Sequence, residues 1–132
     1  MGKIMIDTDI LIMILEKASL KTLEGLLEKY ELYISGIVAF EFLVGVYRTN
    51  KKILKELLEK YFTIVPITYE IIVKAAEIEA DLMRSGQMID PRDALIGATA
   101  IIHEIPLWTN NVKDFKRLEK YGLKLVKIEL EE

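Results

Sequence analysis

Short apolar segments alternate with longer amphipathic segments along the chain. Residues 3–6, 32–34, 62–65 and 105–108 are short apolar runs, and residues 123–128 alternate apolar with polar positions like a half-exposed strand. Between them, apolar positions three or four residues apart predict helices from about residue 8 and over 20–30, 36–47, 50–61, 68–84, 90–102 and about 112–118. This order predicts a single three-layer α/β/α domain with a parallel sheet of four or five strands.

Polar residues mark where several of these helices begin. Ser19, Asn50 and Thr68 each precede a periodic segment, as helix N-caps do. After these caps we expect an inward apolar face formed by Ile53, Leu54, Leu57 and Leu58 in one helix and by Ile71, Ile72, Ala75, Ala76 and Leu82 in the next. The segment after Asp90 and Pro91 is rich in small residues and should therefore pack closely against the sheet.

Composition narrows the classes of protein to consider. With 132 residues and 52% hydrophobic positions, residues 1–132 are expected to form one domain. The absence of cysteine excludes disulfides, zinc–thiolate sites and thiol nucleophiles. No apolar run reaches the roughly 20 residues of a membrane span, so we expect a soluble, cytoplasmic protein without a membrane partner. The net charge of −3 provides no general basic field for nucleic acid, so such a partner would need a local patch.

Two acidic residues stand in unusually apolar surroundings. Asp7 and Asp9 are the only charges in residues 4–15, and Asp7 follows a buried strand, at the sheet edge where ligands bind in open α/β folds. Glu41 lies near the middle of an almost entirely apolar helix, where capping is impossible. Because an unpaired buried charge costs several kcal/mol or more, both need a cation or a hydrogen-bond donor.

Two further acids begin helices, and each has a simpler explanation. Asp93 stands three residues after Asp90, and Asp114 three residues after Asn111, so either pair could be an ordinary helix cap and its partner. Asp7 could likewise cap the helix that follows it. These four acids, each from a separate segment, all stand where a strand ends or inside an apolar helix. This shared setting nevertheless favours one metal site over four separate caps. Oxygen ligands suit Mg²⁺ or Mn²⁺, and the single histidine, His103, is too little for a nitrogen-based site.

At these positions the sequence resembles the PIN-domain ribonucleases, and in particular the compact VapC-type toxins of toxin–antitoxin pairs. The resemblance spans essentially the whole chain and rests on four motifs in order: IDTDILI around Asp7, EFLVG from Glu41, DALIGATA from Asp93 and TNNVKDF from Thr109. It implies that Asp7, Glu41 and Asp93 are the core catalytic and metal-binding acids and that Asp114 is the fourth. It also implies that Thr109 and Asn111 support the site and that the activity is metal-dependent hydrolysis of RNA by an activated water, with one ion or two.

Two positions depart from the family pattern, and a third has no fixed counterpart in it. Asp9 stands where the family usually has asparagine or a small polar residue, so it could add a ligand or cap the helix. Asn110 replaces a usual arginine, and Asp90 matches no fixed family position, so it ranks below the other acids. Arg48, Arg92 and Lys113 are candidate RNA contacts beside the acids, unless they are simply solvated surface.

The resemblance also implies two protein partners, and two other functions stay open. A cognate antitoxin would lie in a groove of the helices over residues 10–30 and 50–61 and project a basic residue toward the acids, and a second copy would form a homodimer. One rival is a haloacid-dehalogenase-like phosphatase with Asp7 as nucleophile, although Ile10 and Leu11 stand where that family has glycine and threonine. The other is a PIN-fold binding module without catalytic activity.

Overall fold

Four parallel strands form the sheet within residues 2–130, which are the residues that this computed structural model describes. They are β1 (Gly2–Ile6), β2 (Tyr30–Ser35), β3 (Thr63–Val65) and β4 (Leu107–Trp108), in the order β3-β2-β1-β4. β1 lies between β2 and β4, with Met5 opposite Tyr33 on one side and Leu107 on the other. The parallel sheet predicted from the sequence is confirmed, while the ends of the predicted domain, residues 1 and 131–132, lie outside the described residues.

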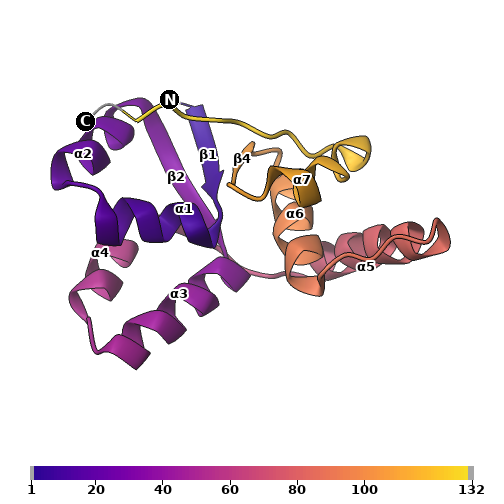
Figure 1. The fold of residues 1–132 in the computed structure, drawn as a ribbon, viewed down its shortest axis with the longest axis horizontal. Helices are drawn as coiled ribbons and strands as arrows, with labels where there is room; N and C mark the ends of the chain where they lie inside the picture. Colours follow the sequence, from indigo (N-terminus) through magenta and orange to yellow (C-terminus); the bar gives the residue numbers. More distant parts are fainter. Residues whose placement is uncertain (1, 131–132) are drawn as a thin grey trace.

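Helices cover both sides of this sheet. They are α1 (Thr8–Ile12), its π-helical continuation η1 (Met13–Lys17), α2 (Leu20–Lys29), α3 (Gly36–Thr49), α4 (Ile53–Tyr61), α5 (Tyr69–Arg84), α6 (Pro91–His103), α7 (Val112–Lys116) and the 3₁₀ helix η2 (Glu119–Tyr121). Figure 1 shows α1 to α4 gathered on one side of β1 and β2 and α5 to α7 on the other. None of the helices within residues 2–130 is both long enough and apolar enough to cross a membrane.

Local sequence explains where most helices begin. The hydroxyl oxygens of Ser19, Ser35 and Thr68 accept hydrogen bonds from backbone N–H groups three residues later, and a carboxylate oxygen of Asp90 accepts one from Arg92 N–H. Each side chain thereby satisfies a donor that the first helical turn would otherwise leave unpaired. The caps predicted at Ser19 and Thr68 are confirmed.

The small residues of α6 allow a close approach. Ile96, Ala98 and Ala100 are buried against the core. A Cβ atom at Gly97 would lie 2.4 Å from Cδ1 of Leu118, so even alanine would require a shift there. This packing holds the N-terminal turn of α6, which carries Arg92 and Asp93, in a defined place relative to the sheet.

The predicted fifth strand over residues 123–128 is wrong. Leu125 forms one isolated bridge with Leu107, in which Leu107 N–H donates to Lys124 O and Val126 N–H donates to Leu107 O. β4 covers only Leu107–Trp108 and is shorter than the predicted 105–108; the carbonyl of Pro106 accepts from Met5 N–H, but proline has no N–H to donate to the sheet. A strand this short offers the returning chain room for only one pair.

Asn50 was also misplaced as a helix start. It ends α3 in the left-handed conformation, with a φ of 57°, and its N–H donates to Val46 and Tyr47 carbonyls. Asparagine tolerates this conformation better than most residues, which makes it a C-cap. α4 begins after Lys52 without a side-chain cap.

Three apolar faces are narrower than the periodicity predicts. Ile53 is 59% exposed, and Ile72 and Ala76 also face solvent, although they were expected inside. On α3, Phe40 is 67% exposed, and Val44 and Tyr47 are exposed on the same side. Glu41 therefore lies on a helix that is only half surrounded by the protein, and it is itself partly exposed.

Candidate active site

Asp7 lies where β1 ends, and its position follows from the pairing of β1 with β4. Its backbone N–H donates to Trp108 O, which brings Thr109 beside it although 102 positions separate the two in sequence. Asp7 Oδ2 accepts a 2.7 Å hydrogen bond from Thr109 Oγ1, and Asp7 Oδ1 accepts one from Thr8 N–H. Asp7 is only 2% exposed. It is therefore both the cap of α1 and a buried carboxylate, so the two interpretations do not exclude each other.

A single guanidinium holds three of the predicted acids. Arg92 Nε donates to Glu41 Oε2 at 2.6 Å, Nη1 to Asp93 Oδ1 at 2.6 Å and Nη2 to Asp7 Oδ1 at 2.9 Å. These acids come from three elements: the end of β1, the second turn of α3 and the first turn of α6. We call Asp7, Glu41, Asp93 and the Arg92 guanidinium the acid cluster.

Thr8 connects the acid cluster and was missed by the sequence analysis. Its Oγ1 donates to Glu41 Oε1 at 2.6 Å and accepts from Arg92 Nη2 at 3.1 Å. Its place directly after Asp7, at the first position of α1, was the available signal. Thr8 and Thr109 thus satisfy the carboxylate oxygens that Arg92 leaves free on Glu41 and Asp7.

The acid cluster carries more negative than positive charge. Burial raises the pKa of Asp93, the nearby Arg92 charge opposes this, and the charge on Asp7 adds to it. Burial lowers the pKa of Arg92, but the hydrogen bond with Glu41 and the charge on Asp7 outweigh burial and raise it above its usual value. Arg92 therefore stays charged while it neutralises only one of the three carboxylates.

Asp114 lies apart from the acid cluster. Its Oδ2 accepts from Asn111 Nδ2 at 3.0 Å, and Arg117 Nη2 lies 3.9 Å from its Oδ1. Within residues 2–130 no hydrogen bond or ion pair joins Asp114 to Arg92, but Asn111 N–H donates to Thr109 Oγ1, which in turn donates to Asp7. The structure thus brings three predicted acids together and connects the fourth through Asn111 and Thr109.

Arg117 lies beside Asp114 at the C-terminal end of α7. Besides its contact with Asp114, its Nη1 donates to Met88 O at 2.6 Å, which ties α7 to the segment before α6.

Asp9 and Asp90 contact backbone rather than the acid cluster. Asp9 Oδ1 accepts from Ile10 N–H and Oδ2 from Asn110 N–H, and Asp90 Oδ1 accepts from Arg92 N–H as the cap of α6. Asp9 therefore joins the start of α1 to the loop after β4. Its two oxygens are directed to these N–H groups and not to the acid cluster, and the N-cap of α1 is Asp7 and not Asp9.

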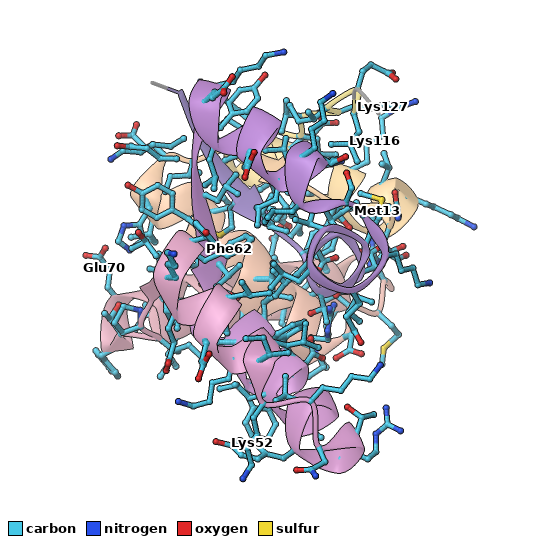
Figure 2. The ribbon with its side chains drawn as sticks, turned by 90° about the vertical axis from the view of Figure 1, so that its left-hand side faces the viewer. Met13, Lys52, Phe62, Glu70, Lys116 and Lys127 are labelled. Atoms are coloured by element: carbon cyan, nitrogen blue, oxygen red, sulfur yellow. The ribbon has the colours of Figure 1, made fainter. Side chains whose placement is uncertain are left out.

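The candidate RNA contacts differ in their placement. Arg48 and Lys113 are exposed, whereas the Arg92 guanidinium is turned inward to the acids. In Figure 2, Lys52 lies at the bottom of the molecule and Lys116 in its upper half, so these two lysines are well separated. Of the three candidates, Arg48 and Lys113 are free of the acid cluster as the structure stands.

The acid cluster provides suitable donors for a divalent ion, but in a different arrangement from a metal site. Carboxylate oxygens are the donors that Mg²⁺ and Mn²⁺ prefer, and here three of them already converge on one cationic group. Yet within residues 2–130 no three acidic or histidine side chains are gathered closely enough to hold a metal ion. Instead, the guanidinium of Arg92 contacts each of the three carboxylates.

Comparisons with known proteins place this arrangement in a family. The model of the PIN domain matches residues 4–121. The chain belongs to the PIN-domain family. It is 38% identical to Ribonuclease VapC1 of Methanocaldococcus jannaschii over 124 residues, covering 94% of this chain and 87% of that protein. It is 39% identical to Ribonuclease VapC1 of Rickettsia felis, covering 95% and 96% of the two chains.

One solved structure is similar to this chain over nearly its whole length. The crystal structure of VapBC2 from Rickettsia felis, bound to a DNA fragment from its promoter, has a TM-score of 0.81 and 25% identity, covering 96% of this chain and 99% of that chain. The predicted α/β fold and the resemblance to PIN-domain, VapC-type proteins are confirmed. The match to this family decides against the haloacid-dehalogenase alternative, in which Asp9 would have to act on substrate together with Asp7.

Proposed function

We propose that this chain is a divalent-metal-dependent ribonuclease of the VapC type, the toxin of a toxin–antitoxin pair. The observation that carries the proposal is the convergence of Asp7, Glu41 and Asp93 on one cationic group. Buried or half-buried carboxylates in excess of their counter-charge are costly unless a cation joins them. Two relatives that share more than a third of their residues with this chain bear the name Ribonuclease VapC1.

Asp7, Glu41 and Asp93 would hold Mg²⁺ or Mn²⁺, with Asp114 beside them. Such an ion, when bound, acts as a Lewis acid and lowers the pKa of a water molecule. Thr109 orients Asp7 through its hydroxyl, and Thr8 orients Glu41 in the same way. Asn111 holds Asp114 and also donates its N–H to Thr109, so one short segment supports both acids.

RNA would approach a site whose own charge is negative. The carboxylates repel a phosphate, so the phosphodiester needs neighbouring cations outside the acid cluster. Arg48 at the end of α3 and Lys113 in α7 are exposed and are proposed to contact the RNA backbone. Contacts of this kind position RNA without reading its sequence.

The test replaces single acids by their uncharged, similarly shaped amides. Asp7→Asn and Asp93→Asn should each lower Mn²⁺-dependent RNA cleavage by more than the roughly 10–100-fold that loss of an outer-shell partner costs. The control is Asp81→Asn, which removes an exposed carboxylate on α5. Circular dichroism checks that each variant is folded. Full activity in Asp7→Asn or Asp93→Asn would disprove the assignment of the chemistry.

An antitoxin and a second copy of this chain are the proposed protein partners. Leu20 on α2 and Ile53 on α4 are exposed on the helices where an antitoxin segment is expected, and Phe40, Val44 and Tyr47 form an exposed apolar stripe on α3 that supports a homodimer. Light scattering should give the mass of a dimer at micromolar concentration.

The antitoxin is expected to be encoded beside this gene and should inhibit RNA cleavage. Inhibition should weaken when the basic residue that the antitoxin projects toward the acids is changed to alanine, or when the Mn²⁺ concentration is raised. A strictly monomeric chain, or inhibition indifferent to both changes, would refute the respective partner proposal.

A further inference from the structure

Arg92 occupies the oxygens that a metal ion would use. Asp7 Oδ1, Glu41 Oε2 and Asp93 Oδ1 each accept from a different nitrogen of its guanidinium. The second oxygens of Asp7 and Glu41 are already taken by Thr109 and Thr8. An incoming ion would therefore compete with the guanidinium for Asp7 Oδ1, Glu41 Oε2 and Asp93 Oδ1, which already accept hydrogen bonds from it.

Charge leads to the same conclusion. A divalent ion among these carboxylates would lie beside the Arg92 charge, and two cations in one partly buried site repel each other. With three carboxylates, however, the cluster needs at least one cation at all times. Arg92 supplies it in the arrangement that the structure shows, and a metal ion would make Arg92 unnecessary.

The position of Arg92 on α6 allows its side chain to leave the acid cluster. Its backbone is held at the start of α6, where its N–H donates to Asp90 Oδ1, while the contacts with the acids are made by the end of a long, rotatable side chain. The side chain is 28% exposed, so a path to solvent exists. Displacement thus requires side-chain rotation but no change in α6.

We propose that Arg92 is a built-in competitor of the metal ion: its guanidinium holds Asp7, Glu41 and Asp93 together in the metal-free protein and is displaced when the ion binds. This inference rests on the proposed metal-dependent function. It assigns Arg92 a role different from a permanent RNA contact, since in the arrangement that the structure shows the guanidinium donates to three carboxylates. Metal affinity then includes the cost of releasing Arg92.

The first experiment measures Mn²⁺ binding by calorimetry without RNA. Arg92→Met removes the charge and keeps an unbranched apolar side chain of moderate length. If Arg92 is released in a tenth of the molecules or fewer, its removal should tighten Mn²⁺ binding by about tenfold or more. The same variant should have a lower melting temperature than wild type in EDTA, because the carboxylates then lack their counter-ion. A purely structural role of Arg92 would lower the melting temperature without tightening Mn²⁺ binding.

Arg84→Met is the matched control. It removes the same charge from an exposed arginine that pairs with Asp81 on α5, so it reports the general effect of a more negative protein. Its Mn²⁺ affinity should stay within about twofold of wild type, because exposed charges are screened by salt. Equal tightening in both arginine variants would overturn the inference in favour of a non-specific charge effect.

A second measurement uses the wild-type protein and does not depend on whether Arg92→Met folds. The Arg92 Nε–H group donates to Glu41, so its nuclear magnetic resonance signal should shift and lose protection from solvent exchange as Mg²⁺ is added. A wild-type protein that binds metal while this signal is unchanged, or an Arg92→Met variant that binds Mn²⁺ no more tightly than wild type, would refute the inference alone. If neither protein binds Mn²⁺ or Mg²⁺, the metal-dependent function fails and the inference fails with it.

Discussion

Two contacts between arginine and carboxylate in this protein differ in how their charges balance. In the acid cluster one guanidinium meets three carboxylates in a half-buried site. On α5, Arg84 Nη2 donates to Asp81 Oδ1 at 3.1 Å, and the hydroxyl of Tyr121 donates to the other oxygen of the same carboxylate. We call Asp81, Arg84 and Tyr121 the Asp81 contact. There, one negative charge meets one positive charge and a neutral phenol.

The two aspartates respond to these surroundings in opposite directions. The hydrogen bond from Tyr121 and the one from Arg84 lower the pKa of Asp81, whereas burial raises the pKa of Asp93 although Arg92 contacts it. The carboxylate in the Asp81 contact has all the partners that its charge needs. In the acid cluster three carboxylates share one guanidinium, and this difference in charge balance is the reason for proposing the metal site in the acid cluster and not at the Asp81 contact.

The largest expected effect is therefore a difference in how metal stabilises variants of the two regions. An ion at about 100 times its dissociation constant should raise the free energy of unfolding of wild type by about 2.7 kcal/mol. In a domain of this size that is a rise in melting temperature on the order of 10 °C. Asp93→Asn should lose most of this rise, while Asp81→Asn should keep it. Thermal unfolding in EDTA and in Mn²⁺ measures both, and equal losses in the two variants would remove the distinction drawn between the regions.

A smaller effect is expected from the hydroxyl groups that hold the acids in place. Thr109→Val removes the donor to Asp7 Oδ2 and should weaken Mn²⁺ binding by roughly 10–100-fold, as loss of an outer-shell partner does. Thr99→Val is the matched control, because Thr99 is a buried threonine whose hydroxyl donates only to Leu95 O within α6. Calorimetry should show unchanged Mn²⁺ affinity in Thr99→Val. If both valine variants bind equally well, Thr109 does not position Asp7.

The smallest effect concerns the Asp81 contact and appears only at alkaline pH. Burial and the hydrogen bond to Asp81 raise the pKa of Tyr121 from 10.0 to about 12. The folded protein thus retains the phenol proton longer than the unfolded chain, so this contribution to stability is complete below pH 10 and is lost as pH rises from 10 to 12. The difference in absorbance at 295 nm between wild type and Tyr121→Phe should titrate near pH 12. In an Asp81→Asn background the midpoint of the Tyr121 titration should fall toward the usual pKa of tyrosine. An unchanged midpoint would show that burial alone raises the pKa of Tyr121.

Much of the fold depends on residues that are close in sequence, which is why it could be predicted. The caps at Ser19 and Thr68 and the strand that ends at Asp7 rest on interactions within a few residues. The predictions failed where a distant partner decides the outcome. Residues 123–128 have the alternating pattern of a strand, but the length of β4 limits them to one bridge. Ile53 and Ile72 fit the apolar period of their helices, but both side chains are exposed within residues 2–130.

The candidate site divides in the same way. The sequence by itself determined that Asp7, Glu41, Asp93 and Asp114 stand in four motifs of one family and that Asp7 is a buried charge in need of a partner, because these properties follow from the residues and their neighbours along the chain. Only the tertiary structure decided which partner it is. Arg92 stands next to Asp93 on α6, where consecutive side chains point in different directions, and it reaches Glu41 across 51 positions and Asp7 across 85. Its long side chain can turn to solvent or to the acids, and the packing of α1, α3 and α6 around one point directs it to the acids.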